Sequence, residues 1–211
     1  MTEPVKPRTY RSPRRAAQAD ETRLAIIAAA RRLFAENGYA ATGMTQIATA
    51  ADVAVQTIYA SVGSKRAILF GLLELIDQEA FVPGFRESMA HERDPARLLA
   101  GAVALTRRLN ERCGDIIAAI RSAAPLEADL AAALAEGQRR HRVGAQGLAR
   151  RLADLGALAP GLSVDDAGTI VSLMTSTDAF DELTKIEGRS FDQAEALIVA
   201  TLTTTILGPK R

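Results

Sequence analysis

The sequence is poor in the residues that stabilise small secreted folds and build metal sites. Its 211 residues include one cysteine, Cys113, two histidines and no tryptophan. One thiol cannot form an internal disulfide, and it cannot supply a site made of several thiolates. We therefore exclude a disulfide-stabilised secreted scaffold, and we expect no metal and no cofactor.

Long hydrophobic runs are also missing. The longest apolar stretches, such as residues 98–105, fall far short of the roughly 18 residues that suggest a membrane span. The N-terminus has basic residues and prolines but no apolar core, so it does not resemble a signal peptide. We expect a cytoplasmic protein that has no membrane partner.

Neither sign of charge dominates the whole chain, whose formal net charge is +1. Residues 1–66, however, contain ten Lys and Arg against five Asp and Glu, and the remainder contains 16 against 20. A basic N-terminal end on a mildly acidic body indicates a polyanionic partner at that end.

Apolar residues recur three and four positions apart, and no stretch sustains the alternation of a half-buried strand. The fold class is therefore expected to be all-α. After a proline-containing basic tail, a helix should begin at an N-cap on Asp20 and stop at Asn37-Gly38. Two short helices, over 44–51 and 55–62, are separated by only three residues and must cross steeply, as in a helix-turn-helix.

The rest of the chain is expected to form a helical body. We expect serine caps at Ser64, Ser163 and Ser190, and an Asp94-Pro95 helix start. Two further helices are expected over 115–124 and 126–155.

The residues that form the helix-turn-helix also carry a family resemblance. Residues 24–39, 47–48, 56–59 and 63–69 together resemble the DNA-binding domain of the TetR family over about fifty ungapped residues. The resemblance implies a flexible tail over 1–17, a three-helix DNA-binding domain over 18–66, and a helical bundle over 67–211 that binds a ligand and dimerises. It implies a homodimeric, ligand-responsive repressor of a palindromic double-stranded DNA operator. The implied effector is a small molecule of unknown identity, and the protein is expected not to be an enzyme.

The second short helix would be the recognition helix, which presents its N-terminal residues to base edges while flanking groups hold phosphates. Gln56 can pair with adenine, and Val55 or Thr57 can contact a thymine methyl group. By the resemblance, Tyr59 and Lys65 bind backbone phosphates. Further candidates at the start of the first short helix are Thr42, Thr45 and Gln46.

Several residues depart from the family pattern. Ala54 and Gly43 stand where Ser or Thr usually caps a helix, and Asp52 replaces a turn glycine, although aspartate tolerates the left-handed region. Ala60 and Val62 replace residues that are often aromatic or histidine. These departures keep open a helical adaptor that binds protein instead of DNA. A helical enzyme is a weaker alternative, because neither histidine has a glutamate three residues earlier and no nucleotide-binding glycine motif occurs.

The long helix of the body has a stripe that includes Gly137, His141 and Gly144. Two glycines would leave room beside the imidazole, so the stripe predicts a ligand cavity anchored by His141. The alternative is close helix packing around a core histidine whose hydrogen bonds are satisfied. Met174 and Phe180 are possible wall residues.

The last helix is broadly apolar, and the resemblance implies that it packs against its counterpart in a second subunit. Two-fold symmetry would then favour a palindromic operator. The alternative is that these residues belong to the core of one chain. The candidates for the dimer surface are Phe191, Leu197, Ile198, Leu202 and Ile206.

Overall fold

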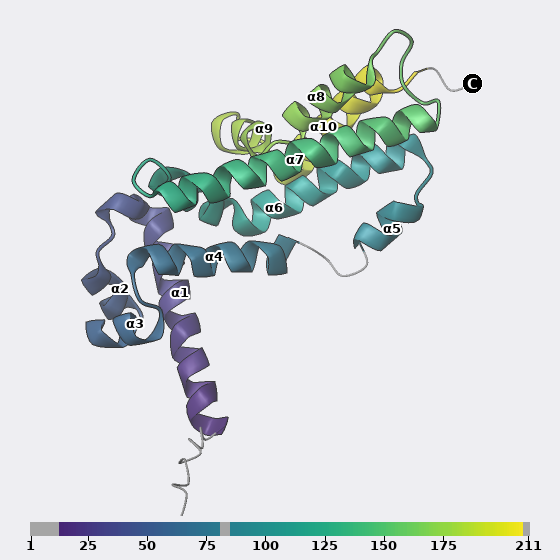
Figure 1. Ribbon diagram of the computed structural model, residues 1–211. Helices are drawn as coiled ribbons and strands as arrows, with labels where there is room; N and C mark the ends of the chain where they lie inside the picture. Colours follow the sequence, from purple (N-terminus) through teal and green to yellow (C-terminus); the bar gives the residue numbers. More distant parts are fainter. Residues whose placement is uncertain (1–12, 81–84, 209–211) are drawn as a thin grey trace, which may run out of the picture. The chain divides into compact units, whose positions relative to one another are not determined.

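The computed structural model describes residues 13–80 and 85–208, and within them the regular elements are helices (Figure 1). One isolated antiparallel bridge joins Leu158 to Leu207. The all-α expectation is therefore confirmed. The helices are α1 (Pro13–Ala41), α2 (Met44–Ala50), α3 (Val55–Ser61), α4 (Lys65–Ala80), α5 (Phe85–His91), α6 (Pro95–Ala123), α7 (Ala128–Asp154), α8 (Val164–Met174), α9 (Thr177–Asp181), the π-helix η1 (Glu182–Ile186) and α10 (Phe191–Ile206).

The chain divides into two compact units, with the boundary between Gly71 and Leu72 inside α4. Among the described residues, no helix is long and apolar enough to cross a membrane.

Helix α1 is longer than the sequence predicted, which corrects the expected N-cap at Asp20. The helix already begins at Pro13, where a proline fits because first-turn N–H groups have no helical partner. No glycine or proline follows before Gly38, so nothing ends the helix earlier. Gly38, with φ 78° and ψ 163°, then breaks the helix as expected, and one more turn follows. Residues 1–12 of the expected tail lie outside the described residues.

The core of the N-terminal unit is formed by α1, α2, α3 and the first turns of α4. Helix α4 approaches α1 closely, because a Cβ added to Gly71 would lie 3.1 Å from Cδ1 of Ile27. Each short helix turns one isoleucine fully inward. The fully buried large side chains of this unit are Ile26, Ile47, Ile58, Ile68 and Leu69.

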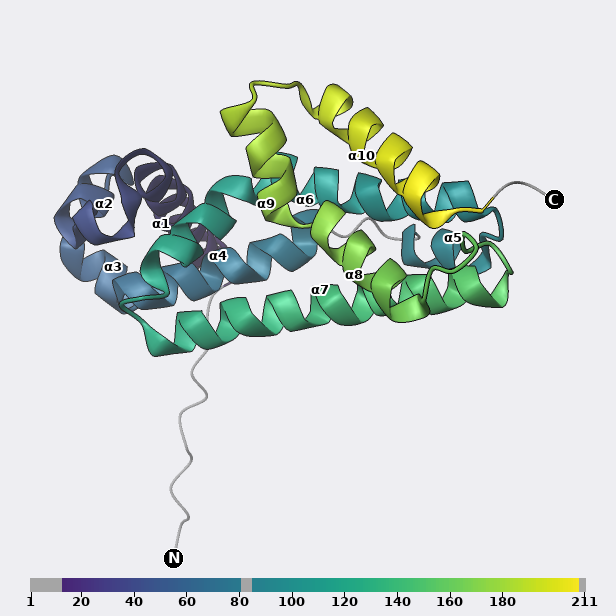
Figure 2. The same ribbon diagram turned by 90° about the horizontal axis from the view of Figure 1, so that it is seen from above.

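In the C-terminal unit, α8 lies along α7 and α10 lies along α6 (Figure 2). The contact between α7 and α8 is tight at Gly168, where an added Cβ would overlap the side-chain amide of Gln146. A side chain at position 168 would have to displace the Gln146 amide, which is the mobile end of that side chain. Fully buried side chains from these helices make one core, among them Leu99, Val103, Leu152, Ala167, Phe180, Ile198, Leu202 and Ile206.

Helix α6 is continuous, which corrects the separate helix expected over 115–124. The buried face continues at helical spacing through Asn110, Cys113 and Ile116. Burial along this face outweighs the roughly 1 kcal/mol by which a glycine such as Gly114 weakens a helix interior.

The expected caps are confirmed. Asp94 Oδ1 accepts hydrogen bonds from the N–H groups of Ala96 and Arg97 at 2.8 and 3.1 Å, so α6 begins at Pro95. Each serine hydroxyl oxygen accepts from the N–H three residues later, and these pairs are Ser64–Ala67, Ser163–Asp166 and Ser190–Gln193.

Arg107 ties α10 to α6. Its Nη1 lies 2.5 Å from Oε2 of Glu195 and 2.7 Å from Oδ1 of Asp192, and its Nε and Nη2 donate to Oε1 of Glu111. The bonds to Glu195, Glu111 and Asp192 raise the pKa of the Arg107 guanidinium above its usual range. One cation therefore bridges three carboxylates and reduces the repulsion among them.

We predict that Arg107→Met lowers the free energy of unfolding by roughly 1–2 kcal/mol, because it breaks charged hydrogen bonds between two helices at a partly exposed site. Urea denaturation followed by circular dichroism measures this change. Arg139→Met is the matched control, since Arg139 pairs only with exposed Glu136 on its own helix. Equal midpoints for both variants would show that Arg107 does not hold α10 on α6.

Candidate nucleic-acid interface

The turn between α2 and α3 has the geometry of a helix-turn-helix. The N–H of Val53 donates to the carbonyl of Ala48 at 3.0 Å, which reverses the chain after α2. Asp52 has φ 53°, and in the described part of the chain it is the only non-glycine residue with a positive φ. The expectation that Asp52 takes over the role of a turn glycine is therefore confirmed.

Both short helices have weak caps, as the sequence predicted. Ala54 at the start of α3 offers no side-chain hydrogen bond. At the start of α2, the N–H of Gly43 instead donates to Oε1 of Gln46 at 2.7 Å. The exposed Gln46 side chain thus has one of its polar atoms engaged within the motif, where the sequence suggested a DNA contact.

Helix α3 has one side buried in the N-terminal unit and one side exposed. Ile58 is fully buried, whereas Gln56 and Ala60 are exposed and Tyr59 is 57% exposed. The phenol of Tyr59 has no hydrogen-bond partner among the described residues. An exposed glutamine and an exposed tyrosine on one short helix are therefore available to an external partner.

The other candidates near the motif differ in accessibility. Val55 and Thr57 are half-buried, and Thr45 in the first turn of α2 is exposed.

The structure corrects the interpretation of Thr42 as a DNA contact, because this residue is only 1% exposed. Its hydroxyl donates to the carbonyl of Gly38 at 2.8 Å and lies 3.2 Å from that of Leu33. Both contacts lie within the N-terminal unit, so Thr42 has a structural role.

Lys65 is also engaged within the N-terminal unit. Its ammonium donates to the carbonyl oxygens of Tyr39 at 2.8 Å and Thr42 at 2.9 Å, and it lies 4.2 Å from the ring centroid of Tyr39. Sequence reasoning assigned Lys65 to a phosphate. It missed the carbonyl contacts because these partners are 26 and 23 residues away and no local pattern links them.

In the C-terminal unit, His141 is a satisfied histidine. Its Nε2 lies 3.0 Å from the carbonyl oxygen of Ser172, which links α7 to α8. Cβ atoms added to Gly137 or Gly144 would meet nothing within 4 Å, and Gly144 is exposed. The inward face expected for α7 is thus corrected, because its buried residues are Leu130, Ala145, Ala149 and Leu152. The small alanines let α8 pack closely on that face.

The remaining ligand and dimer candidates lie mostly inside one chain. Met174 is half-buried, and Phe180 is fully buried with its ring centroid 6.4 Å from that of half-buried Phe191. Leu197 is 40% exposed. Three of the five dimer candidates are fully buried in the core of the C-terminal unit, because they lie on the inner face of α10: Ile198, Leu202 and Ile206.

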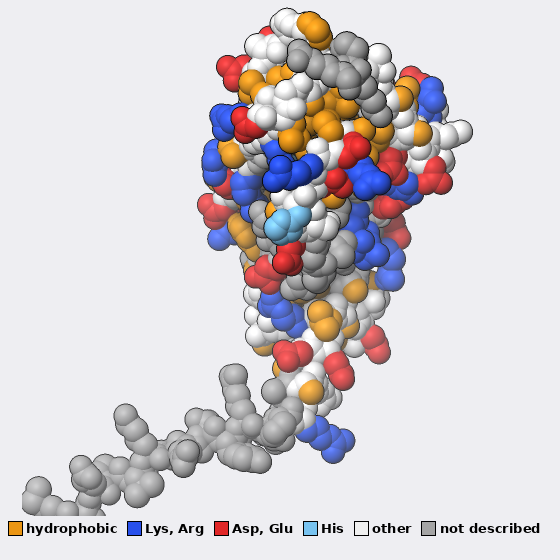
Figure 3. Space-filling view, turned by 90° about the vertical axis from the view of Figure 1, so that its right-hand side faces the viewer, with side chains coloured by type: hydrophobic (Ala, Val, Ile, Leu, Met, Phe, Trp, Pro, Cys, Tyr) orange, Lys and Arg blue, Asp and Glu red, His pale blue; other side chains and the backbone are white. Residues whose placement is uncertain are grey.

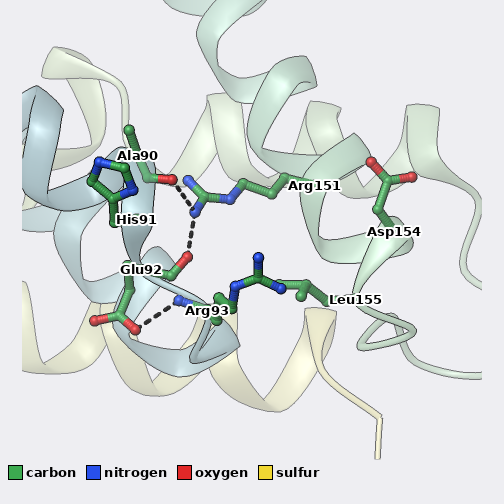
Figure 4. Close-up of a pocket in the computed structure, with 7 residues that line it drawn as sticks. All are labelled: Ala90, His91, Glu92, Arg93, Arg151, Asp154 and Leu155. Carbon is green, nitrogen blue, oxygen red and sulfur yellow. Dashed lines mark hydrogen bonds between the residues drawn. The ribbon is translucent and has the colours of Figure 1, made fainter.

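A groove of about 290 Å³ lies beside the end of α5 (Figure 4). Arg151 from α7 donates to the carbonyls of Met89, Ala90 and Glu92, so it caps the C-terminus of that helix. Backbone N–H groups of Asp94 and Arg93 lower the pKa of the Glu92 carboxyl. The groove is therefore lined mainly by charged groups, in contrast to the apolar pockets that hold most small ligands. On the face of the molecule drawn in Figure 3, acidic and basic side chains lie beside each other.

Sequence reasoning missed Asn110, which is 8% exposed on α6. Its Nδ2 donates to the carbonyl of Thr106 at 3.0 Å, but its buried Oδ1 has no partner among the described residues. The buried face of α6 runs through Leu98, Leu99, Val103, Thr106 and Asn110. The sequence could have indicated a buried Asn110, because this polar residue lies at helical spacing from Val103.

Residues 26–72 match the family described as "Bacterial regulatory proteins, tetR family". The chain is 34% identical over 126 residues to the HTH-type transcriptional regulator HbdR of Aromatoleum sp. (strain CIB). That match covers 57% of this chain and 53% of HbdR, so the chain spans about half the length of this relative.

Solved structures share the fold over nearly the whole chain. A transcriptional regulator from Saccharomonospora viridis in complex with choline has a TM-score of 0.72 at 19% identity, covering 90% of this chain and 100% of that one. The SmeT–triclosan complex has a TM-score of 0.67 at 20% identity, covering 88% and 91%. The TetR family regulator PfmR from Thermus thermophilus has a TM-score of 0.66 at 22% identity, covering 88% and 96%.

We predict that Thr42→Val lowers the free energy of unfolding by roughly 1–2 kcal/mol, because it leaves buried carbonyl groups without their hydroxyl donor. The measurement is urea denaturation. Thr49→Val is the control, because the Thr49 hydroxyl bonds only to its own exposed helix and its loss should change stability by less than about 0.5 kcal/mol. Identical denaturation curves for the two variants would contradict the structural role of Thr42.

Proposed function

We propose that this chain is a transcription regulator of the tetR family, not an enzyme, and that it represses transcription as a homodimer; the match of residues 26–72 to that family supports this proposal. It binds a palindromic operator in the cytoplasm and releases it when a small molecule binds the C-terminal unit. The observation that carries this proposal is the outer face of α3, which presents Gln56 and Tyr59 while Ile58 anchors the helix in the core.

The chemistry of that face suits duplex DNA. The amide of Gln56 can bond N6 and N7 of adenine in the major groove, and the phenol of Tyr59 can donate to a phosphate oxygen. Half-buried Val55 and Thr57 offer methyl groups to thymine, and exposed Thr45 offers a hydroxyl to the backbone. In this assignment base contacts come from the start of α3 and phosphate contacts flank them.

Dimerisation would use the exposed side of the last helices. Leu173 on α8 and Leu197 on α10 are 65% and 40% exposed, although both are large and apolar. Packing them against a second copy removes this surface from water. The buried residues Ile198, Leu202 and Ile206 then support α10 from below, and Phe191 lies at its start. Two-fold symmetry places the recognition helices one turn of DNA apart, about 34–36 Å, or a multiple of it.

The effector is a small molecule bound in the helical body. The solved relatives in complex with choline and with triclosan support this proposal. His141, Gly137, Gly144, Met174 and Phe180 are the candidates from sequence. Asn110 adds a buried acceptor that a donor group on the effector could satisfy. Release of DNA can be no stronger than the difference in effector affinity between the bound and free states.

In-vitro selection of duplexes from a random library, followed by footprinting, tests this function. We expect an inverted repeat whose half-sites lie about one DNA turn apart. Absence of any enriched sequence would contradict operator binding. Enrichment of a single half-site would contradict the symmetric dimer while leaving DNA binding intact.

We predict that Gln56→Ala relaxes the consensus at one base pair of each half-site, because a good bidentate contact contributes about 1–3 kcal/mol of discrimination. Repeating the selection with the variant measures this loss. Gln138→Ala, at an exposed position on α7, is the control and should return the parental consensus. A Gln56→Ala consensus identical to the parental one would remove Gln56 from base recognition.

We predict that Asn110→Leu raises the free energy of unfolding of the ligand-free protein by roughly 1 kcal/mol, because it removes a buried acceptor that has no partner. For a chain of this size the melting temperature should rise by about 2–4 °C. Asn110→Asp should lower the melting temperature, since it buries a charge at the same position. A fall for Asn110→Leu would show that Oδ1 is already satisfied in the ligand-free protein.

A further inference from the structure

We propose that Lys65 is a positioning residue that fixes the corner between α1 and α2, and that it does not bind a DNA phosphate. The ammonium of this half-buried residue donates hydrogen bonds to backbone carbonyl groups at the corner. The inference itself concerns only the fold of that unit, and one arm of its test rests on the proposed DNA binding.

The corner needs a donor because α1 breaks at Gly38. Beyond this break the backbone carbonyls of the final turn have no continuing helix to supply N–H groups. Lys65 donates to two carbonyl groups here, Tyr39 O in the last turn at 2.8 Å and Thr42 O just beyond the helix at 2.9 Å. The Tyr39 carbonyl also accepts from the N–H of Thr42 at 3.3 Å. A cation at the C-terminal end of a helix also interacts favourably with the helix dipole.

The ring of Tyr39 holds the ammonium in place from another side. The Lys65 nitrogen lies 4.2 Å from the ring centroid, within the range of a cation–π contact. The ring itself is fixed, because Tyr39 is buried and its centroid lies 5.5 Å from that of Phe34. Two of the three ammonium N–H groups are therefore used, next to a rigid aromatic surface. A phosphate that took more than the remaining N–H group would have to break these contacts.

The corner sets where α2 begins. Thr42 is followed directly by Gly43, the N-cap of α2. The backbone of Thr42 is held by Lys65, and its side chain is held by Gly38. Because α2 packs on α3, the corner determines how Gln56 and Tyr59 are presented. Lys65 thus acts on the recognition helix through the fold.

Hydrogen exchange of the full-length protein, read by mass spectrometry without DNA, tests the structural arm. In Lys65→Met, we expect amide protection at the α1–α2 corner and in α2 to fall about tenfold, because charged hydrogen bonds to the corner are lost. Lys65→Arg should restore protection to within about twofold, since a guanidinium can also donate to two carbonyls. Unchanged protection in Lys65→Met would overturn the proposal.

Salt titration of binding to a 40-base-pair duplex tests the phosphate arm. The slope of log K against log salt counts the phosphates that lysine and arginine neutralise, at about 0.9 per phosphate. We expect Lys65→Met to weaken binding about tenfold at every salt concentration, on a line parallel to the parental one. Tyr59→Phe should weaken binding without changing the slope, because a neutral phenol neutralises no phosphate, and it should leave protection at the corner unchanged.

A slope reduced by about 0.9 in Lys65→Met would overturn the proposal in favour of a direct phosphate contact. If the parental protein bound no duplex even at low salt, the proposed function would fail. The exchange measurement would still decide the role of Lys65. The two failures are therefore distinguishable.

Discussion

The N-terminal unit depends on how the chain satisfies the carbonyl groups left by the break at Gly38. A helix that stops inside a packed unit must find donors for its last carbonyls, or the corner that follows is not fixed. Here the hydroxyl of Thr42 and the ammonium of Lys65 supply them. Both residues would be read as polar surface residues by composition alone. Their engagement lets the two short helices, each of seven residues, hold a defined geometry.

The short helices could not be stable by themselves. Isolated helices below about 12 residues are marginal in water, and α3 also lacks a side-chain cap at Ala54. Their stability must come from packing, through Ile47 and Ile58, which are both fully buried. Because each inward isoleucine leaves the opposite side of its helix exposed, the same packing that stabilises α3 also presents Gln56 and Tyr59.

The sequence predicted features that depend on local chemistry. The stop at Gly38, the left-handed Asp52 and the caps at Asp94 and Ser190 follow from the conformational preferences of single residues, and all are confirmed. Features that depend on distant partners were not predictable. The contacts of Lys65 join residues more than 20 positions apart, and the continuity of α6 depends on burial that only the folded chain supplies.

In the C-terminal unit, a small error in predicting which face of a helix is buried changes the functional interpretation. An inward stripe assigned to α7 through Gly144 predicts a cavity, whereas burial of Ala145 and Ala149 turns Gly144 outward. On α6, Asn110 lies at helical spacing from buried Val103 and is itself buried. A buried acceptor without a partner destabilises a protein by about 1–3 kcal/mol, and the described residues provide no donor for Oδ1 of Asn110. Under the proposed function, a donor group on the effector would meet that need, and the binding energy gained there would be available to shift the protein away from its DNA-bound state.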